Sequence, residues 1–248
     1  MKVLISYAVF GEEAAQALER SINLNFGVLP DYAVYNKLVV TDRRTPLNIP
    51  CATIRSDGFW RDGFFNVSAA RNAALEYAEI TNMDWAVILD ADGILLDPIH
   101  NDLPDLTKLL IHYMEPGVDL ECWVNTGRYA EWDYRKEHYL ILSRSAFTGN
   151  RYCEKYRGWG CEDSDFIAAV LYPEGFVDGD AVVRSVHLIH PNRDWYDFDD
   201  QGRLKNRHIL RSRVLENYLL RGTPIMSYYF DEKECEWFER CIDEYTKG

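Results

Sequence analysis

The first 90 residues alternate short apolar runs with longer segments in which apolar residues recur every three or four positions. The short runs are rich in β-branched and aromatic side chains, which is typical of buried strands. They cover residues 2–9, 32–40 and 85–89. The longer segments have the spacing of amphipathic helices, and they cover residues 12–24 and 67–80. This β-α-β-α-β order predicts an α/β fold, with a mainly parallel sheet wrapped by helices.

The patterns in the second part of the chain are shorter. Helices are predicted at residues 103–114, 163–171, 209–220 and 231–245, and short strands at residues 121–124, 138–143 and 181–189. In the first part, Ser68 is the expected N-cap of the helix at 67–80. Repeats, linkers and low-complexity segments are absent from the sequence, so residues 1–248 are expected to form one continuous domain.

Composition narrows the class of protein. Hydrophobic residues make up 47% and charged residues 27%, as in globular proteins. The net charge of −13 argues against a broad basic surface for polyanions. We interpret a local basic run as the solvated face of a helix; it comprises Arg203, Lys205, Arg207, Arg211 and Arg213. No apolar run reaches the roughly 18–20 residues of a membrane span, and the six cysteines form no CxxC pair. A cytoplasmic protein with reduced thiols is expected.

The stretch WAVILDADG at residues 85–93 is the most informative segment. A buried strand ends there in two carboxylates, Asp90 and Asp92, which project to the same side because side chains alternate along an extended chain. Ligands of open α/β sheets bind at the carboxyl ends of the strands. Two acids at that place can hold a divalent cation, and the cation can hold a diphosphate. The alternative is a solvated turn, because Asp-Gly pairs favour turns.

A second segment, RGWGCEDSD at residues 157–165, places Glu162 and Asp163 at the start of a predicted helix. The helix dipole favours their charged forms, and a carboxylate there can accept a proton from a sugar hydroxyl as a general base. The preceding glycines give backbone freedom and allow a ligand to approach closely. The alternative is an ordinary helix start with capping acids.

Two further segments complete the candidate site. His187 and His190 close an apolar strand and precede a proline, and imidazole together with carboxylate suits manganese better than calcium. The two histidines can share one ion only if the chain leaves strand geometry between them. Arg71, in the first turns of its helix, can reach a nucleotide phosphate or fix the acid-bearing segments. An ordinary surface arginine is the alternative.

The order of an Arg-Asn helix, LDAD, GWGCEDSD and HLIHP resembles the GT-A fold glycosyltransferases, over most of residues 2–220. The closest likeness is to the β-1,4-galactosyltransferase group, with polypeptide N-acetylgalactosaminyltransferases nearby. The resemblance implies that Asp92 ligates a metal directly and that Asp90 contacts ribose, or the metal through water. His190 corresponds to the metal histidine and His187 to a second ligand. Asp163 corresponds to the catalytic base, with Glu162 orienting the acceptor.

The resemblance also implies roles for neighbouring segments. Trp159 and Gly160 correspond to a shelf for donor and acceptor, and the loop at residues 192–206 to a lid that closes on bound donor. Cys161 stands where a glycine is usual. The family's proline-bearing first strand is replaced here, so Tyr7 or Phe10 is expected to stack on a uracil ring. Residues 1–115 would form the nucleotide-sugar half, residues 116–222 the acceptor and metal half, and residues 223–248 a C-terminal extension.

The implied reaction transfers a hexose (galactose, glucose or N-acetylhexosamine) from a UDP-sugar to an acceptor hydroxyl with inversion, assisted by Mn²⁺ or Mg²⁺. A carbohydrate, a protein or a small molecule is the expected acceptor, and the acidic balance disfavours a nucleic acid. One alternative is a sugar-phosphate nucleotidyltransferase, but residues 9–13 lack the Gly-rich, basic first loop of such enzymes. The other is a catalytically dead sugar- or nucleotide-binding protein of the same fold.

Overall fold

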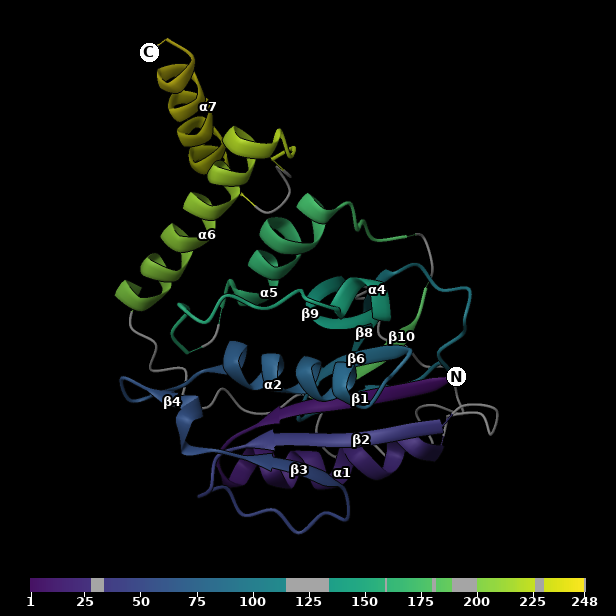
Figure 1. Cartoon of the computed structure of the whole chain (residues 1–248). Coiled ribbons are helices and arrows are strands. Elements are labelled where there is room, and N and C mark those ends of the chain that lie inside the picture. The colour runs from purple at the N-terminus through teal and green to yellow at the C-terminus, as the bar shows by residue number, and fades with distance from the viewer. Residues whose placement is uncertain are drawn as a thin grey trace.

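The computed structural model describes residues 1–27, 34–114, 134–158, 160–179, 182–188, 200–225 and 230–247. Within these stretches the strands of the main sheet are β1 (Lys2–Val9), β2 (Val34–Thr41), β3 (Ala52–Arg55), β6 (Trp85–Asp90), β7 (Gly93–Leu95), β8 (Leu106–Met114), β9 (Tyr134–Ser143) and β10 (Arg184–Leu188). They lie side by side in the order β3-β2-β1-β6-β9-β8-β10-β7 (Figure 1). A separate two-stranded hairpin pairs β4 (Trp60–Arg61) with β5 (Phe64–Phe65).

The sheet is mainly parallel. Strands β3, β2, β1, β6, β8 and β10 run in one direction, and β9 and β7 run in the other. The prediction of a single α/β domain with a mainly parallel sheet flanked by helices is therefore confirmed. The carboxyl ends of β2 and β3 point to the left in Figure 1, so the loops that follow the parallel strands gather along that edge.

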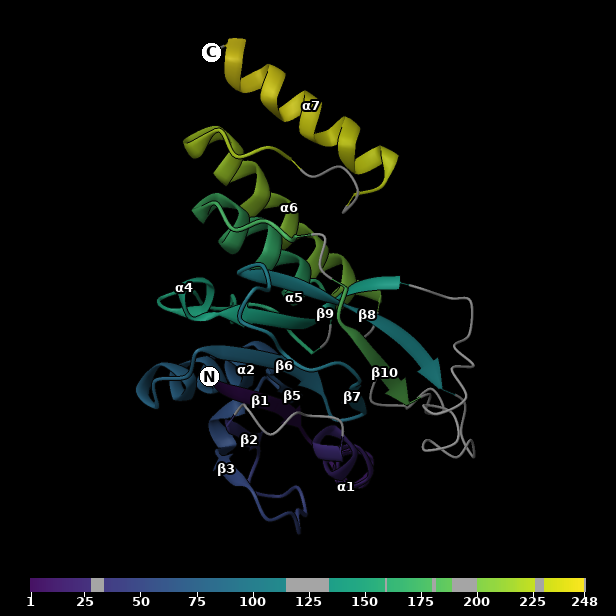
Figure 2. The ribbon, with the colours of Figure 1, turned by 90° about the vertical axis from the view of Figure 1, so that its right-hand side faces the viewer.

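Helices cover both faces of the sheet. The described helices are α1 (Glu12–Gly27), α2 (Val67–Ile80), α4 (Arg144–Phe147), α5 (Glu162–Asp165), α6 (Asp200–Arg221) and α7 (Glu232–Lys247). Figure 2 shows α1 on one side of the sheet and α2 and α4 on the other. A π-helical segment, Phe166–Leu171, continues directly from α5. Helix α7 projects from the far end of α6 and carries the C-terminus (Figure 1).

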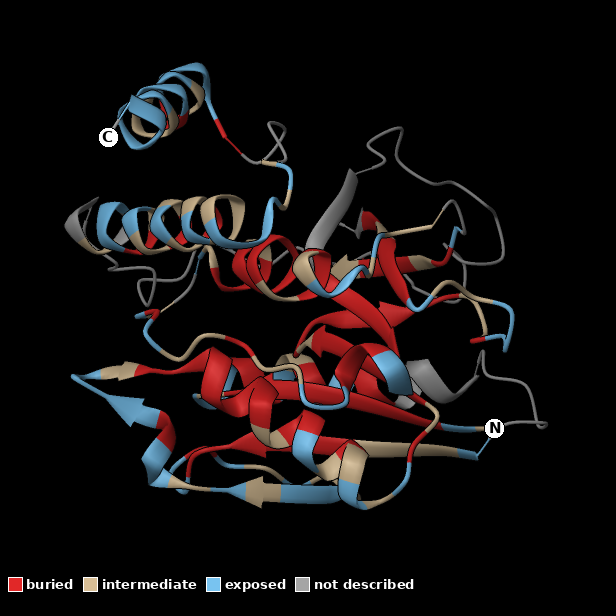
Figure 3. Cartoon of the chain, turned by 45° about the horizontal axis from the view of Figure 1, so that its top comes forward, coloured by how far each residue is buried: buried red, intermediate tan, exposed pale blue. Residues whose placement is uncertain are grey.

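Alternation along β1 shows how the sequence builds two cores. Leu4 and Ala8 face the cluster that contains α2, while Ile5 and Tyr7 face the cluster that contains α1. This follows from the period of two in a strand, which sends successive side chains to opposite faces. Figure 3 shows the buried residues concentrated in the sheet and the helices against it, while α7 is largely exposed.

Two sequence-based predictions of local structure are wrong. The segment at residues 103–114 was expected to be helical, but Leu106–Met114 is strand β8, paired with both β9 and β10. Short apolar runs do not distinguish strand from helix, and pairing on both edges decided the outcome. The N-cap of α2 is Asn66, whose side chain accepts a hydrogen bond from the Ala69 N–H at 2.9 Å. Ser68 instead lies buried in the first turn.

The remaining predicted elements are present, and most of their ends are shifted by at most four residues. The exception is the expected strand at residues 121–124, which lies outside the described residues. The helix predicted at residues 209–220 is longer than expected, because α6 begins nine residues earlier, at Asp200. None of the helices in the described stretches has the length and apolar character needed to cross a lipid bilayer.

Candidate functional site

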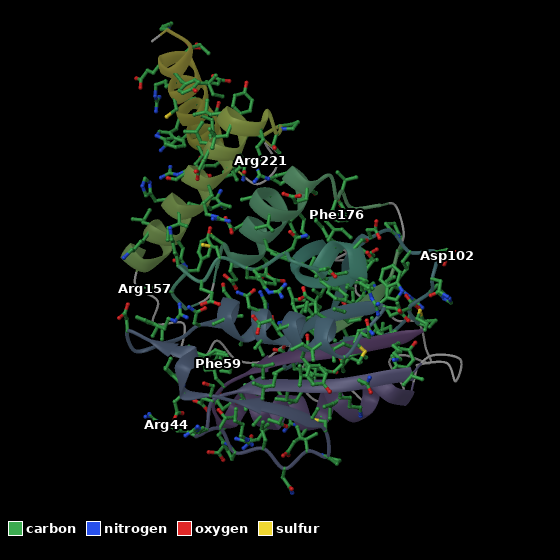
Figure 4. The ribbon with its side chains drawn as sticks, viewed as in Figure 1. Arg44, Phe59, Asp102, Arg157, Phe176 and Arg221 are labelled. Atoms are coloured by element: carbon green, nitrogen blue, oxygen red, sulfur yellow. The ribbon has the colours of Figure 1, made fainter. Side chains whose placement is uncertain are left out.

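A cleft of about 530 Å³ lies at the carboxyl ends of β1 and β2. Phe10 and Gly11 follow β1 and form one side, while Asp42 and Thr45 follow β2 and form the other. Trp60 also lines it, with its ring edge to face against Phe10 at 6.3 Å between centroids. Arg44, another lining residue, lies at this edge of the molecule (Figure 4). A volume of this size suits a nucleoside or similar small molecule.

Hydrogen bonds fix the wall of this cleft. Asp42 accepts bonds from the Thr45 N–H at 2.7 Å, the Arg44 N–H at 3.1 Å and Trp60 Nε1 at 2.6 Å. Burial opposes the ionisation of Asp42, but these bonds outweigh it and lower the pKa of the carboxyl. Thr45 Oγ1 in turn accepts from the Gly11 N–H at 2.8 Å. The loops after β1 and β2 are therefore held together as one rigid wall.

The position of Tyr7 corrects the expectation that its ring stacks on a nucleotide base. Tyr7 is fully buried in the core beneath α1, on the face of β1 opposite to α2. A ring enclosed in this way has no face open to a ligand. Phe10, the alternative in the sequence, lines the cleft and stacks on Phe65 with 4.6 Å between ring centroids. Phe10 and Trp60 are the aromatic residues among those that line this cleft.

Arg71 joins the first two chemistry-bearing segments. The residue is 2% exposed, and its guanidinium bonds Asp90 at the end of β6 at 3.1 Å. It also bonds Asp163 at the start of α5 and lies 3.6 Å from Glu162. A buried arginine needs such partners, because an unpaired charge in the interior is very costly. Of the two roles considered from the sequence, fixing the acid-bearing segments is the one the geometry shows.

The two acids of α5 differ in their surroundings. The side chain of Glu162 is only 2% exposed, whereas that of Asp163 is 11% exposed. Burial and repulsion from Asp163 raise the pKa of Glu162, against the attraction of Arg71. Glu162 also accepts a hydrogen bond from the Gly160 N–H at 2.6 Å, which folds the preceding turn onto it. Asp163 is thus the more exposed of the two acids, and Glu162 holds the turn at Gly160.

Asp92 meets His187, although the two are far apart in sequence. Strand β10 pairs antiparallel with β7, and this register sets His187 opposite Gly93. His187 Nδ1 lies 3.2 Å from Asp92 Oδ1, and the Tyr139 hydroxyl lies 3.0 Å from the same nitrogen. A Cβ on Gly93 would stand 2.9 Å from the Tyr139 ring, so the glycine of the DADG motif makes room for this tyrosine. Sequence reasoning missed Tyr139.

A carboxylate and an imidazole in contact are donors of the type that manganese and similar ions prefer, so Asp92 and His187 fit as two ligands of such an ion. The described stretches contain no group of three or more His, Cys, Asp or Glu side chains arranged for a metal. His190, the expected further ligand, and Trp159, the expected shelf, lie outside the described residues. Gly160, the other residue of the expected shelf, is described, and its backbone N–H donates a hydrogen bond to Glu162.

The predicted lid at residues 192–206 is partly wrong. Its first part lies outside the described residues, but residues 200–206 form the first turns of α6. Asn206 is 1% exposed, and its Nδ2 donates to the Arg157 carbonyl at 3.0 Å and the Gly160 carbonyl at 3.1 Å. Its Oδ1 accepts from the Arg157 N–H at 3.2 Å. Asn206 therefore clamps both ends of the turn that leads into the acids.

The other flank of this segment is tied to α2. We call residues 152–160 the strap, because they run between α2 and α6. Asn66 Nδ2 donates to the Glu154 carbonyl at 3.0 Å. Asn72 donates to the Tyr152 carbonyl at 3.0 Å and accepts from the Tyr152 N–H at 2.7 Å. None of these asparagines was predicted to act on the site, because their partners lie 46 to 88 residues away in sequence.

The basic run on α6 was expected to be a solvated helix face, but two of its arginines bond acids of neighbouring helices. Arg213 Nε bonds the fully buried Asp165 at 2.6 Å, which attaches α6 to α5. Arg207 Nε bonds Glu234 of α7 at 2.6 Å. Because other helices, α5 and α7, supply these two acids, the amphipathic pattern of α6 alone could not reveal the partners.

Comparison with known proteins gives structural matches only. No protein-family model matches the chain, and no curated protein matches its sequence. S. aureus TarS solved with UDP is 13% identical, with 96% of this chain and 78% of that chain covered and a TM-score of 0.45. The same protein with UDP-GlcNAc gives 12% identity, coverage of 94% and 77%, and a TM-score of 0.47.

A third similar structure is a variant of a Drosophila β-1,4-galactosyltransferase 7 in complex with manganese, UDP-Gal and xylobiose. It is 14% identical, with 74% of this chain and 65% of that chain covered and a TM-score of 0.45. At these identities and scores we base the function on the residues of this chain.

Proposed function

We propose that this chain is a metal-dependent, inverting glycosyltransferase that moves a hexose from a UDP-sugar to an acceptor hydroxyl. The observation that carries the proposal is the buried Arg71, whose guanidinium bonds both Asp90 at the end of β6 and Asp163 of α5. This contact supports the convergence of the diphosphate-binding and base-bearing segments. The cleft lined by Phe10 and Trp60 at the same edge of the sheet supports nucleoside binding there.

Each residue has a distinct part in the proposed reaction. Asp163 accepts the proton of the acceptor hydroxyl while that oxygen attacks the anomeric carbon from the face opposite the departing UDP. Arg71 keeps this carboxylate in place, and Glu162 holds the turn at Gly160 against it. A Mn²⁺ or Mg²⁺ ion bound by Asp92, His187 and His190 would neutralise charge on the diphosphate. Displacement in one step with a separate base gives inversion.

The same proposal divides the chain by task within its one domain. Residues 1–115 contribute the cleft, Arg71 and the two aspartates, and so bind the nucleotide sugar. Residues 116–222 contribute the acids of α5 and the histidines, and so bind the acceptor and complete the metal site. Residues 223–248 form a C-terminal extension that includes α7. The acceptor is a carbohydrate, a protein or a small molecule, and the expected setting is the cytoplasm.

The test is the substitution Asp163→Asn, measured as UDP release from a panel of UDP-sugars with manganese. General-base assistance contributes about 10²–10⁴-fold, so turnover is expected to fall by that order while UDP still binds in calorimetry. Asp102→Asn is the control, since this exposed residue lies on the far side of the molecule (Figure 4). Full turnover in Asp163→Asn, or release of pyrophosphate from UTP in place of UDP, would contradict the proposal.

A further inference from the structure

A second pocket of about 340 Å³ lies between the β4–β5 hairpin, the strap and α6. Its lining includes three apolar residues, Phe64, Phe65 and Ile209, which we call its floor. Its rim carries four cationic side chains: Arg61, Lys155, Arg157 and Lys205. Arg157 lies beside the end of α6 that is nearest the hairpin (Figure 4).

The rim is unusual for this protein. The chain carries a net charge of −13, yet this pocket gathers four cations and only two acids, Asp62 and Glu154. The acids pair with two of the cations across the pocket. Arg61 lies 2.6 Å from Glu154, and Arg157 lies 2.6 Å from Asp62. All four of these side chains are more than a third exposed, so each pair is weak and an incoming anion can replace its carboxylate.

The two lysines that line the pocket, Lys155 and Lys205, differ from its two arginines. Among the described residues, neither Lys155 nor Lys205 forms an ion pair, whereas Arg207 and Arg213 of the same basic run bind Glu234 and Asp165. Lys205 therefore differs from Arg207 and Arg213 in the same run: it lines this pocket and forms no ion pair with a described residue. Two cations that form no ion pair in the described part of the chain, together with an apolar lining, match a sugar ring that carries a negative group.

The pocket is joined to the proposed base through short lengths of chain. Phe65 and Asn66 line it, and Asn66 caps α2, the helix whose Arg71 holds Asp163. Gly158 also lines it and belongs to the turn that Asn206 clamps and that ends at Glu162. A ligand in this pocket would thus lie next to the turn that precedes Asp163.

We propose that this pocket binds a carboxylate or phosphate group of the acceptor, so that the preferred acceptors are acidic carbohydrates. This inference rests on the proposed glycosyltransferase function and names its acceptor class. Lys155 and Lys205 hold the anionic group, and the apolar floor contacts a sugar face. The acceptor hydroxyl is thereby directed toward Asp163.

The kinetic experiment compares three acceptors that differ in one group: a neutral glucoside, the corresponding glucuronide and the corresponding sugar phosphate. UDP release is measured with the donor that the panel identifies. The KM for the two anionic acceptors is expected to be about tenfold lower than for the neutral one. Lys155→Gln/Lys205→Gln should remove this preference and leave kcat and the donor KM unchanged, while the corresponding double arginine variant keeps the preference.

Lys233→Gln/Arg240→Gln is the matched control, because it makes the same change of charge on exposed residues of α7. It should leave the acceptor preference intact. Equal KM values for neutral and anionic acceptors, or an unchanged preference in Lys155→Gln/Lys205→Gln, would overturn the inference. A preference for only one of the two anionic acceptors would assign the pocket to carboxylate or to phosphate.

Calorimetry without donor separates this inference from the proposed function. Methyl glucuronide and glucose phosphate are titrated into the wild type and the double glutamine variant. Binding that only the wild type shows supports the pocket even if no UDP-sugar is consumed, in which case the proposed function alone fails. Consumption of a UDP-sugar with no binding of either anionic probe leaves the proposed function standing and overturns the pocket.

Discussion

At the scale of single residues, Arg71 explains how two distant acidic segments become one site. Nothing in the spacing of NVSAARN distinguishes a surface arginine from a buried one. In the fold its guanidinium is enclosed and contacts Asp90, Glu162 and Asp163. Because a buried cation is tolerated only with charged partners, the position of α2 fixes the positions of these carboxylates.

Cys161 shows a second residue-scale effect. It adopts φ = 70°, in the left-handed region that favours glycine, directly before Glu162. A side chain in this region costs of order 1 kcal/mol or more. The turn that presents the acids is therefore strained, and its partly buried thiol packs against the core.

We predict that Cys161→Gly is more stable than Cys161→Ala by about 1 kcal/mol, because both lose the thiol and only glycine relieves the backbone. Urea unfolding of the two variants measures the difference. At a position with ordinary φ the order would be reversed, with glycine less stable than alanine by roughly 0.5–1 kcal/mol. A reversed order would show that the turn is not strained in solution.

At the scale of elements, the strap between α2 and α6 holds the site together. Asn72 and Asn66 attach it to α2, and Asn206 attaches it to α6. Helix α6 therefore controls the turn before the acids, although α6 contributes none of the proposed catalytic groups. A shift of α6 would be transmitted to Glu162 through Gly160.

We predict that Asn206→Ala lowers the free energy of unfolding by about 2–4 kcal/mol, because three hydrogen bonds are lost at a buried position. Asn206→Asp should be at least as harmful, since a carboxylate cannot donate to the Arg157 and Gly160 carbonyls. Chemical denaturation measures both variants. Asn217→Ala, which removes one bond from the same helix to the Ala169 carbonyl, is the comparison and should cost less.

The junction of α6 and α7 gives a prediction about pH. Burial opposes the ionisation of Glu234, but hydrogen bonds from Arg207 outweigh it and lower the pKa of the carboxyl. A lowered pKa in the folded state contributes stability above the ordinary glutamate value of about 4.3. That stability is lost as the pH falls through the folded-state value.

Glu234→Gln should therefore be less stable than the wild type at neutral pH, by about 1–2 kcal/mol, and the difference should shrink as the pH falls below about 4. Thermal unfolding across this pH range measures it. Glu236→Gln is the control, because this neighbouring glutamate is exposed on the same helix. A difference that stays constant with pH would show that the Arg207–Glu234 pair does not stabilise α7.

At the scale of the whole molecule, the proposed metal site joins Asp92 of residues 1–115 to histidines of residues 116–222. Ligands that use this site should therefore stabilise the fold. A ligand present at 100 times its Kd adds about 2.7 kcal/mol to the free energy of unfolding. We predict that UDP with manganese raises Tm more than UDP alone, and that Asp92→Ala abolishes the manganese-dependent part. Thermal unfolding and calorimetry with UDP measure this. An equal manganese effect in Asp92→Ala would exclude Asp92 as a ligand.

The sequence predicted secondary structure correctly where the local pattern of apolar residues fits only one kind of element. The strand at residues 2–9 and the helix at 67–80 were predicted closely, because periodicity and burial agree there. The segment at 103–114 was misassigned because its apolar residues suit either element, and pairing with β9 and β10 decided it. Tyr7 was assigned to the nucleotide site because the sequence does not show which face of β1 it occupies.

What the sequence alone determined is the chemistry available and the edge of the sheet at which it gathers, because carboxyl ends of parallel strands share one edge. Asp90, Asp92 and Asp163 were predicted as site residues from their positions at the end of a strand and at the start of a helix. Only the tertiary structure decided the partners: Arg71 for Asp163, His187 for Asp92, and Asn206 for the turn that precedes Glu162. These contacts join residues 46 to 95 positions apart, and they depend on the packing of α2 on the sheet, the pairing of β10 with β7 and the packing of α6 against α5.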